Sequence, residues 1–346
     1  MQITLTPQEM QALERSWMQR SAVPGILLME HAAQGVTAAI TRHCPAKSSV
    51  LFLCGPGNNG GDGFAAARLW QAAGGRALVW ALSEQSSGDS AVNRCLAVQA
   101  GASVQTLRSL PDALPPVDAV VDALFGTGLT RTVEGLAAGL IRLVNGSGKP
   151  VIAVDIPSGL NGATGQPMGC AVRAAETVTF HRPKQGLLLG PAAEYTGQLS
   201  VQPILIPLSE GPQDGLRCLE AEDVERLLPP RSPAVHKGCF GRVLIFAGAP
   251  GMAGAAAYCA RAAVKCGAGL TTILCRASLL PLLQTLVPAA MCIPLPEDTD
   301  GHLLPAATDI ARAAMDRADL PLSAPGSERT PICCRFSLCS PAGQSQ

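Results

Sequence analysis

The chain has 346 residues, of which 47% are hydrophobic and 15% charged, and its 26 Lys and Arg residues balance 26 Asp and Glu residues. This length favours two domains, and this composition supports large buried cores, so an intrinsically disordered chain is excluded. Balanced charge and an aromatic content of 3% provide neither a basic field nor base-stacking platforms for nucleic acid.

Targeting and redox signals are absent from the sequence. The first five residues lack the basic and apolar regions of a secretory signal, and no apolar run reaches the ~18 residues that a membrane helix needs. None of the 13 cysteines forms a C-x-x-C pair, so zinc-site and thioredoxin spacings are missing. We therefore expect a soluble, cytoplasmic protein that does not bind membranes.

Two helices are predicted at the N-terminus. The segment Thr6-Pro7-Gln8-Glu9 is a capping box with proline at the first helical position, which predicts a helix to about Arg20. A second helix is predicted to follow Pro24-Gly25 and to end near His43.

Strand-like and helix-like segments then alternate as far as residue 206. The expected strands are 50–54, 77–82, 118–122, 150–155, 176–180 and 199–206, and the expected helices include 64–73, 91–100 and 136–144. The strand runs are continuously apolar, which is typical of strands covered on both faces. This alternation predicts an α/β fold with a three-layer, doubly wound sheet.

The most informative motif, GPGNNGGDGF, follows the first of these strands. Glycines let a backbone approach a ligand closely, and the start of a helix offers free N–H groups to a phosphate. The segment Asn58, Asn59, Gly60, Gly61 and Asp62 is therefore a candidate phosphate cradle. It matches neither GxGxxG nor GxxxxGK[ST], and glycine-rich turns also close βα units that bind no ligand.

Two further strands end in an aspartate with glycine downstream. Asp122 begins the loop DALFGTGLTR, and Asp155 begins DIPSGLN. Because ligands of open parallel sheets bind at the carboxyl ends of the strands, we expect the three loops to converge there. For either aspartate alone, the alternative role is a helix N-cap. The Asn, Asp and Ser oxygens of these loops also suit a hard cation, either monovalent or divalent.

The three motifs, in this order, resemble the NAD(P)H-hydrate epimerase family over residues 1–215, which implies a Rossmann-like domain. The resemblance implies that the substrate, hydrated NADH or NADPH, contacts Asp155 and the two glycine-rich loops. These loops comprise Asn58, Asn59, Gly60, Gly61, Asp62, Gly126, Thr127, Gly128, Leu129, Thr130, Arg131 and Thr132. It also implies that Asn59, Asp122 and Ser158 hold one potassium ion.

The chemistry that the resemblance implies is inversion at carbon 6 of a hydrated nicotinamide ring. Proton abstraction is implausible there, since no adjacent carbonyl stabilises a carbanion. Instead, the ring nitrogen can expel hydroxide, and water can re-enter from the other face with one carboxyl group as acid and base. We assign this role to Asp155. We interpret Lys184 as a solvated loop cation, with contact to a substrate phosphate as the alternative. For the chain as a whole, the alternative is a non-catalytic binding or scaffold protein.

The second half of the sequence begins after a linker, 216–235, that contains one short helix near residues 222–228. The motifs HKGCFGRVLI and GMAGAA, from His236 and Gly251, resemble the ADP-dependent NAD(P)H-hydrate dehydratase, which has a ribokinase-like fold. The two resemblances together match a bifunctional repair enzyme.

The resemblance in the second half is incomplete. Beyond Arg276 the chain has only three glycines, and none lies in a GxGD loop or a Lys-Gly nucleotide loop. We expect one βα unit, with Pro321 preventing a last strand, and therefore a partial, inactive domain over 236–320 that makes no use of ADP. We interpret 321–346 as an aberrant, disordered tail that results from a frameshift or truncation, or from natural divergence. Whether the chain forms a homo-oligomer stays open.

Overall fold

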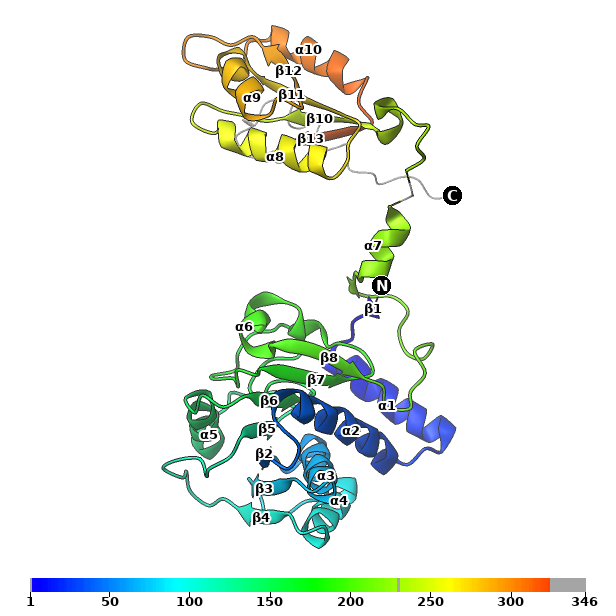
Figure 1. Cartoon of the computed structure of the whole chain (residues 1–346), viewed down its shortest axis with the longest axis vertical. Coiled ribbons are helices and arrows are strands. Elements are labelled where there is room, and N and C mark those ends of the chain that lie inside the picture. The colour runs from blue at the N-terminus through cyan, green and yellow to red at the C-terminus, as the bar shows by residue number, and fades with distance from the viewer. Residues whose placement is uncertain (1, 229–230, 324–346) are drawn as a thin grey trace. The chain divides into compact units, whose positions relative to one another are not determined.

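The computed structural model describes residues 2–228 and 231–323 of the chain. Its contacts divide the chain after Leu228 into two compact units, which are described one at a time (Figure 1). Within the described ranges, no helix combines the length and the apolar character that a membrane span requires.

The first unit alternates strands and helices along most of its length. Its parallel strands are β2 (Ser49–Cys54), β3 (Arg76–Ala81), β4 (Ser103–Thr106), β5 (Ala119–Ala123), β6 (Val151–Val154), β7 (Glu176–Phe180) and β8 (Gln198–Gln202). Its helices are α1 (Pro7–Ser21), α2 (Gly25–His43), α3 (Asn58–Ala72), α4 (Gly88–Gln99), α5 (Gly135–Asn145), α6 (Ala193–Thr196) and α7 (Ala221–Leu227). The strands form one sheet in the order β4-β3-β2-β5-β6-β7-β8, as the predicted doubly wound fold requires.

Helices cover both faces of this sheet, which explains the continuously apolar strands. Along β2, Val50, Phe52 and Cys54 belong to the core beneath α2 and α3. The intervening Leu51 and Leu53 belong to a second core against α5. Figure 1 shows α1–α4 on one side of the sheet and α5 on the other. The result is a three-layer domain.

The N-terminal segment is fixed at the start of α1 and in the residues before it. The capping box is present: Thr6 Oγ1 accepts from the Glu9 N–H at 3.2 Å, and Glu9 Oε2 accepts from the Thr6 N–H at 2.7 Å. Before it, β1 (Gln2–Ile3) pairs antiparallel with β9 (Arg217–Cys218). The predicted linker, 216–235, is therefore divided, because its first residues pair with the N-terminus and α7 belongs to the first unit.

The second unit contains more regular structure than the sequence predicts. Its strands are β10 (Arg242–Phe246), β11 (Leu270–Arg276), β12 (Met291–Leu295) and β13 (Leu320–Ser323), and its helices are α8 (Ala253–Lys265), α9 (Leu280–Leu286) and α10 (Ala306–Met315). The strands form a parallel sheet in the order β12-β11-β10-β13. The expectation of a single βα unit is therefore wrong.

Pro321 does not prevent the last strand, because β13 lies at the edge of its sheet. An edge strand has one side without a partner, so proline's missing N–H breaks no hydrogen bond there. Pro294 occupies the opposite edge strand, β12, in the same way. Of the predicted tail, residues 321–323 thus belong to β13. The expectation for residues 324–346 lies outside the described residues.

Candidate active site

The predicted convergence of three loops is confirmed by the strand order. From β2 the chain builds outward through β3 and β4, then returns to place β5 on the other side of β2. Ligands of doubly wound sheets bind at such a reversal, beyond the carboxyl ends of the strands. A pocket of about 650 Å³ lies there, and it is lined by residues that follow β2, β5 and β6.

The first glycine-rich motif is helical, not a loop that precedes a helix. α3 begins at Asn58 rather than near residue 64, and its N-cap, Gly57, provides no side-chain cap. A Cβ on Gly60 would lie 1.9 Å from the carbonyl oxygen of Gly55, so only glycine permits this tight entry into the helix. The first N–H groups of α3 are therefore available beside the pocket.

Most of the predicted substrate-binding residues line the pocket. These are Asn58, Asn59, Asp62, Gly126, Thr127, Gly128, Leu129, Thr130, Arg131 and Asp155. Three predicted residues lie elsewhere: Gly60 faces Gly55, Gly61 faces Met29 and Ser90, and Thr132 lies against Gly169. Gln11 of α1 donates to Thr127 Oγ1 at 3.3 Å, which connects the second loop to the first helix.

The oxygen-rich residues predicted to hold potassium gather beneath the second loop. The Asp122 carboxylate accepts from the Ser158 N–H at 2.8 Å and from the Leu124 N–H at 3.3 Å. Ser158 Oγ accepts from the Phe125 N–H at 2.9 Å and donates to the Phe125 carbonyl at 3.2 Å. Burial raises the pKa of Asp122 to about 6, although hydrogen bonds from Ser158 and Leu124 oppose the rise. Asp122 is thus not a helix N-cap.

Asn59 completes this group from the start of α3. A Cβ on Gly126, the residue after Phe125, would lie 2.8 Å from Asn59 Oδ1. The buried Asn59 Nδ2 has no hydrogen-bond partner among the described residues. Within that part of the chain, no cluster of three or more His, Cys, Asp or Glu side chains could hold a metal ion. The group offers one carboxylate and several neutral oxygens, which fits a monovalent cation.

Asp155 is held as half of a buried ion pair. Lys184 Nζ lies 2.5 Å from Asp155 Oδ1, and Thr179 Oγ1 donates to the same oxygen at 3.1 Å. Lys184 is 1% exposed and also donates to Thr179 Oγ1 and the Phe180 carbonyl, both at 3.1 Å. The interpretation of Lys184 as a solvated loop cation is therefore wrong. Its distance from Asp155 along the chain concealed the pair.

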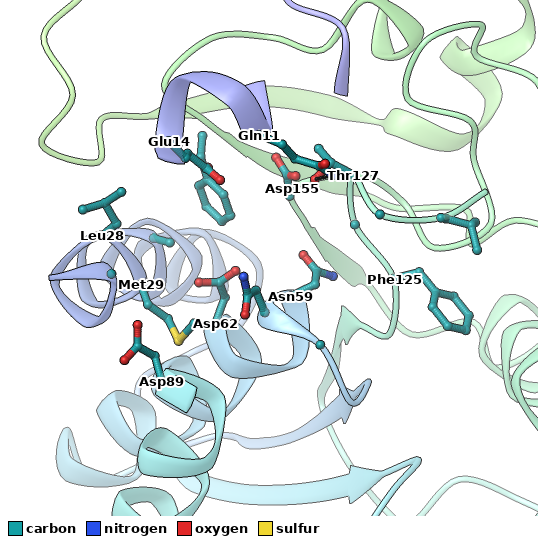
Figure 2. A pocket seen from close by; sticks show the side chains of 18 of the residues that line it. Gln11, Glu14, Leu28, Met29, Asn59, Asp62, Asp89, Phe125, Thr127 and Asp155 are labelled. Carbon is teal, nitrogen blue, oxygen red and sulfur yellow. Dashed lines mark hydrogen bonds between the residues drawn. The ribbon is translucent and has the colours of Figure 1, made fainter. Parts of the chain in front are cut away.

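Two further carboxyl groups face this ion pair. Glu14 lines the pocket from α1, and Asp62 lines it from α3 (Figure 2). Burial raises the pKa of Glu14 to about 7, with Lys184 opposing the rise and Asp155 adding to it. Burial raises the pKa of Asp62 well above its ordinary value, and the charges of Asp155 and Glu14 raise it further. Burial in this site therefore favours the protonated forms of both carboxyl groups.

The sequence did not predict that α1 forms one wall of the pocket. Gln11, Glu14, Arg15 and Met18 all line the pocket, and their spacing of three or four residues places them on one face of the helix. Polar residues at this spacing resemble an ordinary solvated face. The capping box located the helix, but no signal in the sequence showed what its polar face covers.

Comparison with known proteins identifies the family of this chain. Residues 25–186 match the family described as YjeF-related protein N-terminus. The chain is 38% identical over 208 residues to an NAD(P)H-hydrate epimerase of Rhodopirellula baltica, covering 59% of this chain and 85% of that protein. The chain belongs to the NAD(P)H-hydrate epimerase family.

Other members of the epimerase family are longer. The chain is 36% identical over 340 residues to a bifunctional NAD(P)H-hydrate repair enzyme of Moorella thermoacetica, covering 94% of this chain and 64% of that protein. It thus spans less than two thirds of the length of such bifunctional relatives. A crystal structure of the yeast protein YNL200c shares the fold, with a TM-score of 0.50 and 20% identity over 57% of this chain and 86% of that one.

Proposed function

We propose that this chain interconverts the R and S epimers of hydrated NADH and NADPH. The observation that carries the proposal is the Asp155–Lys184 pair, fixed at a strand end inside a pocket whose other side is a glycine-rich helix start. Family membership supplies the substrate class, and the pocket supplies groups suited to it.

The dinucleotide's phosphates would bind at the start of α3. Its uncapped N–H groups and positive helix dipole favour an anion, and Gly60 brings the helix start close to the β2 turn. The loop of residues 126–131 would close over the substrate from the other side, held to α1 by the Gln11–Thr127 hydrogen bond. This arrangement would direct the nicotinamide ring toward Asp155.

The reaction needs a group that moves protons at the oxygen on carbon 6. When the ring nitrogen expels that oxygen, it must receive a proton, and the water that returns must lose one. Asp155 would take part in this transfer, because its carboxyl group lines the pocket while Lys184 and Thr179 fix its orientation. General acid–base catalysis of this kind contributes about 10²- to 10⁴-fold to a rate.

We further propose that Asn59, Asp122 and Ser158 hold a potassium ion. The support is the position of Asn59 Oδ1 beside Gly126, in the same loop region as the Asp122 carboxylate, the Ser158 hydroxyl and the Phe125 carbonyl. The bound ion would supply positive charge that fixes the 126–131 loop. An orientation role of this kind affects the rate only when the geometry is tight.

We expect no ADP-dependent dehydration from this chain. The sequence beyond Arg276 contains only Gly301, Gly326 and Gly343, none of them within a GxGD loop. The second unit nonetheless forms an organised parallel sheet, so the expectation rests on the missing motifs alone.

Chromatography of the two epimers tests the proposal. Pure R-hydrate of NADH is mixed with catalytic amounts of protein, and conversion to the S epimer should far exceed the spontaneous rate. The Asp155→Asn variant should bind the hydrate normally and lose this acceleration. Asparagine tolerates the positive φ of 65° at this position, so the backbone is preserved. Binding without any exchange by the native chain would instead support the binding-protein alternative.

A further inference from the structure

We propose that Glu14 is a second catalytic acid–base residue, acting with Asp155 on opposite faces of the nicotinamide ring. The inference rests on the proposed epimerase function and extends it to a residue of α1. It follows from the positions of the two carboxyl groups and from the stereochemistry that inversion demands.

Asp155 is too constrained to serve both faces of a flat ring. Its Oδ1 accepts from Lys184 at 2.5 Å and from Thr179 at 3.1 Å, and its backbone N–H donates to the Val178 carbonyl at 2.8 Å. The whole residue is 7% exposed. A carboxyl group fixed in this way presents its free oxygen to one side of a bound ring only.

Glu14 supplies the complementary position. It lies on the face of α1 that forms one wall of the pocket, whereas Asp155 lies at the strand ends that form another. Figure 2 shows the Glu14 carboxyl entering the pocket from α1 and the Asp155 carboxyl entering it from the sheet. Within the described part of the chain the Glu14 side chain makes no hydrogen bond, so its carboxyl is free to meet a ligand. A ring bound between these walls would meet one carboxyl group on each face.

The two groups together balance the reaction. The protonated carboxyl donates its proton to the departing oxygen, the C–O bond breaks, and the nitrogen lone pair forms a C=N bond. A water molecule on the opposite face then adds to carbon 6, the C=N electron pair returns to nitrogen, and the water gives one proton to the other carboxylate. One water is released and one is taken up, and the two carboxyl groups have exchanged protonation states. The same two groups, with reversed roles, perform the return reaction.

Productive enzyme therefore carries one proton shared between the two groups. The charged and titratable groups around Glu14 are Asp155 and Lys184 at the strand ends, Asp62 on α3 and Arg15 on α1. Burial raises the pKa of Glu14 to about 7. The charges of Lys184 and Arg15 oppose this rise, and the charge of Asp155 adds to it. The rate should fall as pH rises through about 7, because the shared proton is then lost. No net proton enters the equilibrium between epimers, so both directions must share this profile.

The test compares Glu14→Gln with Glu9→Gln in the full chain. Both changes remove a carboxylate from α1, but Glu9 caps the helix away from the pocket, and glutamine preserves the capping box. We expect Glu14→Gln to lower kcat by about 10²- to 10⁴-fold with little change in KM. The residual activity of this variant should no longer show the alkaline limb, which is the fall in rate as pH rises through about 7. Glu9→Gln should retain the native rate and profile. Glu14→Asp should keep part of the rate, and thermal unfolding verifies that each variant folds.

Three other outcomes would count against the role of Glu14 or against the epimerase function on which it rests. A Glu14→Gln variant with native kcat and an unchanged alkaline limb overturns it. An alkaline limb that persists in Glu14→Gln and disappears in Asp62→Asn overturns it too, and gives the role to Asp62. A native chain that exchanges no epimers shows instead that the proposed function has failed, and the inference fails with it.

Discussion

Asp155 is strained and buried, and both features are typical of functional residues. Its φ of 65° lies in the left-handed region, which costs a non-glycine residue about 1–3 kcal/mol. The strain persists because the Val178 carbonyl, Lys184 and Thr179 all hold the residue in place. The strain lowers the stability of the fold, and the contacts hold the Asp155 carboxyl group in one direction.

Removing one member of the ion pair should be costly. In Lys184→Met, the Asp155 carboxylate would stay buried without its cation, so we expect a loss of about 3–5 kcal/mol in unfolding free energy. The double variant Lys184→Met/Asp155→Asn removes both charges and should recover most of that loss. Urea unfolding of the native chain, Lys184→Met, Asp155→Asn and the double variant measures this coupling. If Lys184→Met and the double variant were equally stable, the predicted coupling between Lys184 and Asp155 would be contradicted.

At the scale of elements, the site depends on how α3 enters from β2. The helix begins six residues earlier than the apolar pattern predicts, because the glycines at 60, 61 and 63 conceal its first turns. The close approach of Gly60 to Gly55 then places the N–H groups of α3 beside the strand ends. The phosphate-binding geometry we propose is therefore a property of backbone packing.

Adding a single methyl group should disturb this entry. In Gly60→Ala, the new Cβ would lie 1.9 Å from the Gly55 carbonyl oxygen, so the helix start must shift. Overpacking of this kind costs about 1–3 kcal/mol, and we expect weaker binding of the hydrate as well. Gly57→Ala is the control for stability, since nothing lies within 4 Å of its added Cβ. Equal unfolding free energies for the two variants would show that α3 has room to adjust.

The sequence predicted elements better than it predicted their contacts. Continuous apolar runs located the first unit's central strands, because burial on both faces leaves a local signature. Glu14 and Lys184 left none, since a polar residue on a helix or after a strand looks the same whether it meets solvent or a carboxylate. In the second unit the prediction from Pro321 was wrong, because Pro321 lies in an edge strand, which tolerates proline.

At the scale of the whole molecule, the pocket is built entirely from the first unit. All of its lining residues lie between Gln11 and Ile204. The second unit has its own sheet and its own cores, one on each face. Activity at the pocket should therefore be independent of the second unit.

Shortening the chain tests this independence. A chain truncated after Leu228 keeps the β1–β9 pairing and α7, so we expect it to fold with the first unit's structure. Its kcat and KM for epimer exchange should equal those of the full chain, and neither chain should dehydrate the S epimer with ADP. Loss of exchange in a folded, truncated chain would show that the second unit contributes to the site.

The most direct measurement follows both the epimer and its oxygen. Pure R-hydrate is incubated with catalytic amounts of the full chain in water enriched in the heavy oxygen isotope, and the products are separated and weighed by mass spectrometry. We predict rapid formation of the S epimer, with the heavy isotope in each newly formed molecule, because the original oxygen leaves and solvent water replaces it. Conversion no faster than in buffer alone, or an S epimer that keeps its original oxygen, would contradict the account.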